Sequence, residues 1–416
     1  MKKKYKKKFK YLKTLDKKIE LILEKESIRQ RNSAVFIASE NYASERVRNY
    51  SNSIFTNKYA EGYPGKRYYA GCENADEVEN LAISRGKKLF SSKHINVQPH
   101  SGSQANMAAY VSLLKPGDKI LSLSLDHGGH LSHGHNVNFS GKIYEIHNYF
   151  LNRESELLDY DQINDIAEKV KPKLIICGYS AYSRIIDFNK FKSISQKVGS
   201  LLMADIAHIA GLVVSGKHPS PVGIADIITS TTHKTLRGPR GGLAIIREDL
   251  SSKYDRGVFP AIQGGPLMNT ILAKAAAFEE ALSDNFIEYS QQIIDNAKVL
   301  ANLFLDRGLR IVSGGTDNHL MLIDTRSIGI NGDEAENKLN EVGIVVNKNA
   351  IPFDPMPPKI TSGIRIGTPA ITSRQISNED LLKIGDVIVD CLSTSSKNTS
   401  VFSKEVQKIM NKLPLP

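Results

Sequence analysis

Two charged residues stand where apolar, strand-like segments end. The segment "LLMADIAH" runs into Asp205, and "ADIITSTTHK" ends at Lys234. Because ligands gather at the carboxyl ends of parallel strands, a carboxylate and an amine are predicted to share one site. Either residue alone is equally well a solvated or ion-paired side chain. Together they indicate pyridoxal phosphate, which needs a lysine to form a Schiff base and an acid to keep its ring nitrogen protonated.

A phosphate-binding turn is a third feature that this cofactor needs. The stretch "PHSGSQAN" precedes a helix predicted over 104–114, which places Ser101, Gly102 and Ser103 at the helix N-terminus. Free backbone N–H groups and the helix dipole bind anions at such a position. The alternative is an ordinary serine N-cap, and the residues leave both interpretations open.

Two arginines beside glycines offer further contacts to anions. Arg240 lies in "HKTLRGPRGG", directly after the lysine, and Arg365 lies in "SGIRIGTPAIT" near the C-terminus. A guanidinium at Arg365 could hold a substrate carboxylate through two parallel hydrogen bonds. A surface ion pair is the other interpretation, and the sequence does not decide between them.

Four of the eleven histidines, His127, His130, His133 and His135, fall within nine positions. Such a cluster could bind zinc. However, glycines interrupt any helix that would direct the four rings to one point, and Asp126 is the nearby carboxylate available to orient them. We therefore expect no metal site in this segment.

Strand-like and helical segments alternate through the middle of the chain. We predict strands over 119–123, 174–177, 201–204, 225–229 and 243–246, and helices over 12–29, 104–114, 161–170 and 266–281. The alternation is typical of an α/β protein with a largely parallel sheet flanked by helices. Shorter strands and a helix after residue 281 indicate a second, smaller α/β domain. The predicted division is a basic tail and helical arm over 1–55, a large domain over 56–281 and a small C-terminal domain over 282–416.

Composition favours a globular protein with a large core. The 416 residues are 41% hydrophobic and 24% charged, which is ordinary for such proteins. We find neither an apolar run long enough to span a membrane nor the apolar segment of a secretory signal. The three cysteines are far apart and form no CxxC pair, which favours reduced thiols and a cytoplasmic location.

Positive charge is concentrated at the N-terminus. The net charge is +11, and the first thirteen residues hold eight lysines and no acid, which leaves +3 for the rest of the chain. An arm that binds nucleic acid is one interpretation. We expect a solvated terminus instead, because no basic stripe with interleaved aromatic residues follows downstream.

Ten segments together resemble the serine hydroxymethyltransferase family, in the family's order, over about residues 15 to 395. They are "IASENY", "TNKYAEGYPGKRYYAGCE", "NVQPHSGSQAN", "DHGGHLSHG", "GYSAYSR", "ADIAHIAGL", "TTHKTLRGPRGG", "FPAIQGGP", "VNKNAIPFDP" and "TSGIRIGTPAIT". The resemblance implies a fold-type I pyridoxal-phosphate transferase whose large domain holds a seven-stranded, mostly parallel sheet. It also implies reversible transfer of the hydroxymethyl carbon of L-serine to tetrahydrofolate, which gives glycine and 5,10-methylenetetrahydrofolate.

The resemblance also assigns the cofactor contacts. Lys234 would form the Schiff base, Asp205 would bind the ring nitrogen, and His130 would stack on the ring face. The side of the ring that carries the 3-oxygen would meet Ser180 and His208, and His233 would line the pocket. The phosphate would be held by Ser101, Gly102 and Ser103, and by Gly264 and Gly265 from the partner subunit of a homodimer.

Substrate contacts follow from the same resemblance. Arg365 and Ser39 would bind the serine carboxylate, while Tyr59, Glu61 and Tyr69 would reach the site across the dimer interface. Glu61 would transfer the proton between the serine hydroxyl and folate. Tetrahydrofolate would contact Glu61, Tyr68, Leu125, Gly129 and Asn349. The residues expected to act in catalysis are Lys234, Glu61, His233, Asp205 and His130.

A different reaction on the same cofactor, such as aminotransfer or decarboxylation, is the nearest alternative in chemistry. The tyrosine-rich segment "NKYAEGYPGKRYY" favours the hydroxymethyl transfer, because it matches the segment that the family uses for serine and folate.

Overall fold

The computed structural model describes residues 16–394 and 399–416. The lysine-rich start of the chain, and the first residues of the helix predicted over 12–29, lie outside these ranges. No helix in the described part of the chain is long and apolar enough to cross a membrane.

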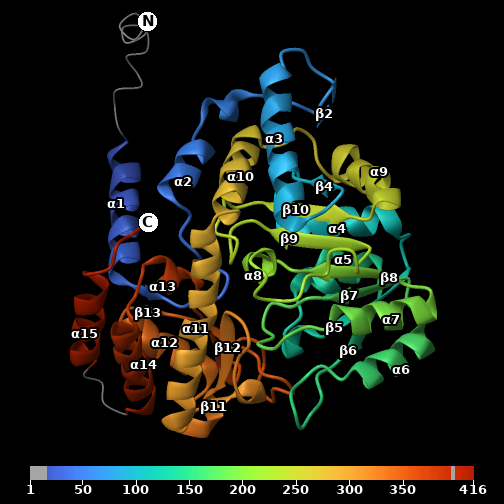
Figure 1. Ribbon diagram of the computed structural model, residues 1–416. Coiled ribbons are helices and arrows are strands. Elements are labelled where there is room, and N and C mark those ends of the chain that lie inside the picture. Colours follow the sequence, from blue (N-terminus) through green and yellow to red (C-terminus); the bar gives the residue numbers. More distant parts are fainter. Residues whose placement is uncertain (1–15, 395–398) are drawn as a thin grey trace, which may run out of the picture.

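A seven-stranded sheet forms the centre of the larger part of the molecule (Figure 1). All its strands run in one direction except β10, which is antiparallel to both of its neighbours. In spatial order the strands are β4 (Ile95–Asn96), β10 (Gly242–Ile246), β9 (Ile227–Thr231), β8 (Leu201–Asp205), β7 (Leu174–Cys177), β5 (Lys119–Leu123) and β6 (Glu145–Tyr149). The prediction of a mostly parallel seven-stranded sheet is confirmed.

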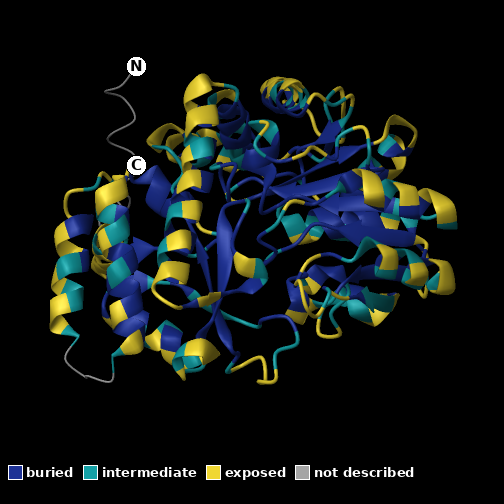
Figure 2. Cartoon of the chain, turned by 60° about the horizontal axis from the view of Figure 1, so that its bottom comes forward, coloured by how far each residue is buried: buried dark blue, intermediate teal, exposed yellow. Residues whose placement is uncertain are grey.

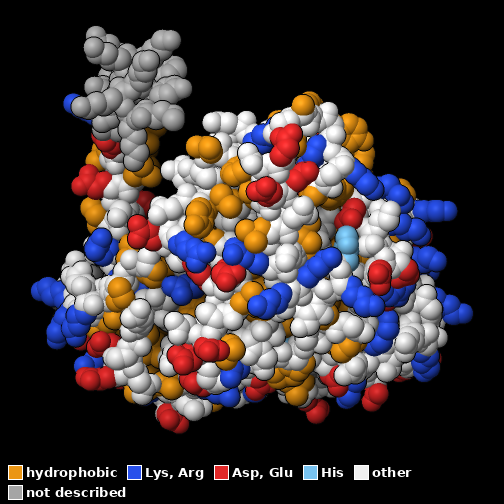
Figure 3. All heavy atoms as spheres, turned by 45° about the horizontal axis from the view of Figure 1, so that its top comes forward, with side chains coloured by type: hydrophobic (Ala, Val, Ile, Leu, Met, Phe, Trp, Pro, Cys, Tyr) orange, Lys and Arg blue, Asp and Glu red, His pale blue; other side chains and the backbone are white. Residues whose placement is uncertain are grey.

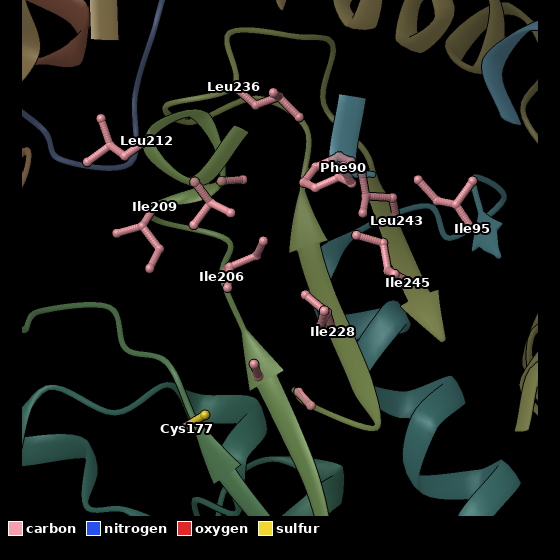
Figure 4. Packing of buried hydrophobic residues seen from close by; sticks show 14 of the residues in the cluster. Phe90, Ile95, Cys177, Ile206, Ile209, Leu212, Ile228, Leu236, Leu243 and Ile245 are labelled. Atoms are coloured by element: carbon pink, nitrogen blue, oxygen red, sulfur yellow. The ribbon is translucent and has the colours of Figure 1, made fainter. Parts of the chain in front are cut away.

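Alternate residues of these strands enter two different cores. Leu121, Ile175 and Leu202 pack into the core on one face, whereas Ile120 and Ile176 pack into the core on the other. This period of two follows from the pleat of a strand, and both faces are apolar because helices cover both. Figure 4 shows Ile228, Leu243 and Ile245 of neighbouring strands packed beside Phe90 and Ile95.

Helices cover both faces of this sheet, and Figure 2 shows the buried sheet enclosed by helices with exposed outer sides. The first core includes residues of α3 (Glu73–Phe90), α6 (Tyr160–Val170), α7 (Phe188–Val198), α8 (Ala210–Val214) and α10 (Met268–Ala281). The other core includes residues of α4 (Gly102–Leu113) and α9 (Glu248–Arg256), with α5 (Phe139–Ile143) beside it.

A second, antiparallel sheet lies in the C-terminal part of the chain. Its order is β11 (Arg310–Ile311), β12 (Leu320–Asp324), β15 (Gly363–Gly367) and β14 (Asn347–Asn349). Around it lie α12 (Gly332–Glu341), α13 (Pro369–Ser373), α14 (Asn378–Ser393) and α15 (Ser400–Met410). A two-residue strand near the N-terminus, β1 (Ala34–Val35), pairs with β13 (Ile344–Val345), so this early segment enters the C-terminal core.

One long helix, α11 (Asp284–Asp306), connects the two sheets. Phe286 and Ile293 near its start pack into the first core, and Leu300 and Phe304 near its end pack into the second. The remaining elements are α1 (Lys17–Asn32), α2 (Glu45–Ser51), the hairpin β2 (Gly62–Tyr63) and β3 (Lys66–Arg67), and the short turns η2 (Ile54–Asn57), η3 (Leu125–His127), η4 (Leu131–His133), η5 (Gly257–Ile262), η6 (Val312–Gly314) and η7 (Thr325–Ile328).

Gly178, directly after β7, provides a test of how closely the strand ends approach. Its φ is +98°, and a Cβ there would lie 1.9 Å from the backbone oxygen of Asp205. We expect Gly178→Ala to lower the free energy of unfolding by about 3 kcal/mol or more, because it adds a steric overlap to left-handed backbone strain. Chemical denaturation measures the change.

Gly199→Ala is the matched control. Gly199 has a φ of +69°, but a Cβ there would meet nothing within 4 Å. It should cost only about 1–2 kcal/mol, the strain of a left-handed residue alone. Equal losses in the two variants would contradict the close approach at Gly178.

Candidate functional site

A cleft of about 1010 Å³ opens beside the carboxyl ends of β8 and β9 and is closed from the other side by residues of the second sheet. This is where ligands bind in open α/β sheets. The structure brings most of the predicted site residues together here. Those that line the cleft are Ser39, Ser101, Gly102, Ser103, Leu125, Gly129, His130, Ser180, Asp205, His208, His233, Lys234, Asn349 and Arg365.

Asp205 ends β8 with a buried, fully hydrogen-bonded carboxylate. His133 Nε2 lies 2.9 Å from Oδ2, Asn106 Nδ2 donates to the same oxygen at 2.9 Å, and the Ala207 N–H donates to Oδ1 at 3.0 Å. Burial alone would raise the pKa of Asp205, but the hydrogen bond and charge of His133, with help from His130 and Asn106, hold that pKa well below its ordinary value. The side chain is therefore a carboxylate, able to bind a protonated nitrogen.

Lys234 follows β9 and lines the same cleft, with 8% of its surface exposed. Burial lowers the pKa of its ammonium to about 8, the nearby Arg365 and Arg240 act in the same direction, and Asp205 opposes them. Its backbone oxygen accepts a hydrogen bond from Asn41 Nδ2 at 2.8 Å. A lysine with this pKa holds a usable fraction of neutral, nucleophilic amine near pH 7.

His130 is held at the cleft by its neighbour Ser132. The Ser132 N–H donates to His130 Nδ1 at 3.2 Å, and Ser132 Oγ lies 2.7 Å from the same nitrogen. Ser132 Oγ is in turn bound by Asn106 Nδ2 at 2.9 Å. Burial, followed by the charge of His133, lowers the pKa of His130 to about 4. The ring is therefore neutral near pH 7 and suited to packing against an aromatic ligand.

The start of α4 forms a cradle for an anion. Ser101 is the N-cap, and its Oγ accepts from the Gln104 N–H at 3.2 Å. The N–H groups of Gly102 and Ser103, by contrast, have no acceptor among the described residues. Gly102 is required by packing, because a Cβ there would lie 2.7 Å from Thr231 Cγ2. The N-cap interpretation of Ser101 is confirmed, and the free N–H groups of Gly102 and Ser103 remain available for an anion.

Lys274, on α10, stabilises the backbone next to this cradle through hydrogen bonds. The sequence analysis did not predict this role. Its buried Nζ donates to the backbone oxygens of Val97 at 2.6 Å, Pro99 at 3.1 Å and Gly242 at 2.7 Å. It thereby ties β4, the turn before α4 and β10 together. A lysine inside an alanine-rich helix, "AKAAAF", is the sequence signal that could have identified it.

Arg365, on β15, brings a guanidinium from the second sheet to the cleft. Its Nε donates to Asn347 Oδ1 at 3.1 Å and its Nη1 donates to the Ser180 backbone oxygen at 2.7 Å. Nη2 has no acceptor among the described residues. Burial lowers the pKa of Arg365 to about 10, so the group stays charged. It is the side chain best placed to bind a carboxylate.

The remaining predicted residues form a separate group outside the cleft. Tyr59 donates to Glu61 Oε1 at 3.1 Å, and Tyr69 donates to Glu61 Oε2 at 3.3 Å. Gly264 and Gly265 lie beside Glu61 and Tyr59. Tyr68 packs against Phe259 and is 73% exposed. One chain therefore does not bring this group to the cleft.

The four clustered histidines have different partners. His127 Nδ1 accepts from the Leu151 N–H and its Nε2 faces the Phe353 N–H. His135 Nδ1 accepts from the Val137 N–H. His130 lines the cleft, and His133 binds Asp205. The sequence analysis gave His133 no role, whereas the structure makes it a direct partner of the buried carboxylate of Asp205.

The cleft fits pyridoxal phosphate group by group. Asp205 can bind the ring nitrogen, Lys234 is an amine for the aldehyde carbon, and the α4 start offers N–H groups to the phosphate. The cleft wall also carries a buried polar atom, Nδ1 of His233, that has no hydrogen-bond partner in the described part of the chain, and burial lowers the pKa of this ring to about 3. Such atoms are costly unless a ligand or water binds them.

Comparison with known proteins points to the same family as the motifs. A family model described as serine hydroxymethyltransferase matches residues 12–388. The chain is 53% identical over 390 residues to "Serine hydroxymethyltransferase 1" of Pseudomonas fluorescens (strain Pf0-1). The aligned residues make up 94% of this chain and 95% of that protein.

His133→Ala tests the support of Asp205. We expect the free energy of unfolding at pH 7 to fall by about 2 kcal/mol, since a buried carboxylate loses one partner. The depressed pKa of Asp205 contributes stability above the unfolded-state pKa, near 4, that is lost as the pH falls through the folded-state value. Without His133 that pKa rises, so acid unfolding should begin at a higher pH. His135→Ala, in the same segment, is the control. It should change the free energy of unfolding by less than about 0.5 kcal/mol and leave the pH at which acid unfolding begins unchanged.

Proposed function

This chain belongs to the serine hydroxymethyltransferase family, and from that premise we propose which of its residues perform each part of the reaction. The enzyme transfers the hydroxymethyl carbon of serine reversibly to tetrahydrofolate and forms glycine and 5,10-methylenetetrahydrofolate, with pyridoxal phosphate as cofactor. It thereby supplies one-carbon units and glycine.

The presence of Asp205 and Lys234 in one cleft carries the assignment of roles. We propose that Lys234 holds the cofactor's aldehyde carbon and that Asp205 keeps the ring nitrogen protonated. His130 would pack on the ring face, Ser180 and His208 would meet the 3-oxygen side, and His233 would line the pocket. The phosphate would be held by Ser101, Gly102 and Ser103. When bound, pyridoxal phosphate withdraws electrons from Cα of the amino acid, so that the Cα–Cβ bond of serine can break.

Serine would be oriented through its carboxylate. The free Nη2 of Arg365 can donate to one oxygen of the carboxylate, and Ser39, which lines the same cleft, can donate to the other. Lys234, whose pKa is about 8, can take up or release a proton near neutral pH. Folate is proposed to lie along Leu125, Gly129 and Asn349, which line the cleft.

We propose that the site is completed by a second copy of the chain. Glu61, held by two tyrosine hydroxyls and outside its own cleft, would enter the partner's cleft and move the proton between the serine hydroxyl and folate. The other residues of this group are Tyr59, Tyr68, Tyr69, Gly264 and Gly265. Their exposure supports this arrangement, since Tyr59 is 56% and Tyr69 is 48% exposed.

The helix α1 gives independent support for a homodimer. None of its residues is buried, and its apolar side chains Ile19, Ile22 and Leu23 are each more than half exposed. In Figure 3 the column below the grey atoms, which is α1 in Figure 1, carries hydrophobic side chains among acidic and basic ones. An exposed group of apolar side chains on one helix is commonly covered by another protein surface. We also propose a cytoplasmic location, because Cys72, Cys177 and Cys391 are free.

Serine cleavage is the direct test of the function. Wild-type protein should convert serine to glycine in a reaction that depends on tetrahydrofolate. With bound cofactor it should absorb light at about 420 nm. Lys234→Ala should lose that absorption and at least about 10³-fold of the turnover. Lys253→Ala, an exposed lysine, is the control and should behave as wild type. Wild-type turnover in Lys234→Ala would refute the lysine assignment.

The shared site predicts complementation between two inactive variants. Glu61→Ala and Lys234→Ala, mixed in equal amounts under refolding, form half mixed dimers, each with one intact site. Activity should therefore recover to about a quarter of the wild-type value. Light scattering checks that a dimer forms. A mixture as inactive as its components, with the dimer intact, would show that Glu61 acts within its own chain.

A further inference from the structure

A pair of buried histidines lies behind the cleft. His208, three residues after Asp205, lines the cleft, whereas His319, directly before β12, does not. His208 Nδ1 lies 3.2 Å from His319 Nε2, and the ring centroids are 5.5 Å apart. His208 is 5% and His319 is 0% exposed. The hydrogen-bonded path from the His319 ring to the cleft therefore runs through His208.

The position of His319 is rigidly determined by its neighbours. Thr368 N–H donates to the His319 backbone oxygen at 3.0 Å. The two chain neighbours of His319 are also bonded: Asn318 Nδ2 donates to the Tyr182 backbone oxygen at 3.0 Å, and the Leu320 N–H donates to Asn318 Oδ1 at 3.1 Å. These bonds join β12 to the loop after β7, so the two rings are held together by both parts of the molecule.

Both rings are neutral near pH 7. Burial lowers the pKa of His319 to about 3, with Arg365, Lys234 and His218 acting in the same direction. Burial, then the charges of Lys234 and Arg365, lowers the pKa of His208 well below its ordinary value. A neutral imidazole carries one N–H and one bare nitrogen. Only one of the two facing nitrogens can therefore supply the hydrogen of the shared bond.

Nδ1 of His319, the ring nitrogen that does not face His208, decides which of the two facing nitrogens carries the hydrogen of the shared bond. His319 Nδ1 is buried and has no hydrogen-bond partner among the described residues. A proton there would be an unpaired buried donor, and buried orphan N–H groups are rarer than under-satisfied acceptors. The proton of His319 therefore belongs on Nε2, where it is donated to His208 Nδ1. The single proton of His208 must then sit on Nε2, which has no protein partner among the described residues.

We propose that His319 is a positioning residue that fixes His208 as the Nε2–H tautomer, so that His208 presents a hydrogen-bond donor to the cleft. Given the proposed role of His208 at the 3-oxygen of pyridoxal phosphate, that donor stabilises negative charge on this oxygen. The reverse tautomer would present a lone pair to the same oxygen and repel it.

The tautomer can be read directly in the full chain without cofactor. Protein labelled with ¹⁵N only at histidine gives ring-nitrogen NMR shifts that distinguish protonated from bare nitrogens, and His208→Asn and His319→Gln assign the signals. We expect a bare Nδ1 and a protonated Nε2 in both rings. A protonated Nδ1 on His208 would overturn the proposal. This measurement is independent of turnover, so the expected tautomer in a protein that does not cleave serine would refute the proposed function alone.

Cofactor affinity separates positioning from a structural role. His319→Leu removes the donor, and His319→Gln replaces the imidazole N–H with an amide N–H. The apoprotein should bind pyridoxal phosphate about tenfold more weakly in the leucine variant and within about threefold of wild type in the glutamine variant. For an analogue that lacks the 3-hydroxyl group, the leucine variant and wild type should bind equally. Equal weakening for both ligands would show that His319 has a structural role only. If the leucine variant does not fold, the NMR spectra of wild type and His319→Gln still decide which tautomer His208 adopts.

Discussion

A buried carboxylate at the end of β8 constrains the whole site. A charge in the interior is tolerated only when partners replace its lost water. Asp205 obtains those partners from three places: His133 in the loop after β5, Asn106 on α4, and the N–H of Ala207 in its own turn. The histidine loop, α4 and β8 must therefore keep one fixed geometry, and His130 and the anion cradle are carried on the same segments.

Positive charge otherwise prevails around the cleft. Besides Asp205, the cleft is lined by Lys234, Arg240, Lys348 and Arg365 against the carboxylates of Glu40 and Asp126, and Arg365 has backbone and amide partners rather than a carboxylate. Lys274 under the cradle is likewise held by three carbonyl oxygens. Cations held by neutral dipoles leave their field uncompensated, and such a field attracts anions. This charge balance suits a phosphate and an amino-acid carboxylate, the two anionic groups that the reaction brings in.

The two sheets contribute different functions to the site. The parallel sheet supplies Asp205 and Lys234 at neighbouring strand ends, whereas the antiparallel sheet supplies Arg365 and stands behind His319. α11 packs into both cores and holds the sheets in one relation. Small changes at this junction would shift the proposed substrate-carboxylate contact of Arg365 relative to the proposed cofactor contacts, and catalysis is sensitive to such shifts.

The sequence by itself determined the local features. Apolar runs predicted the strands 119–123 and 174–177 with their observed bounds, strand-end residues identified Asp205 and Lys234, and long motifs identified the family. Each of these depends on neighbouring residues in the chain, or on matches read along it. The roles of His133, Lys274 and His319 were decided only by the tertiary structure, because their partners are distant in the chain. The partner of His133 is 72 residues away, those of Lys274 are 32 to 177 residues away, and that of His319 is 111 residues away. No local pattern records which distant group a buried polar side chain will meet, since packing of the sheets and α11 creates that neighbourhood.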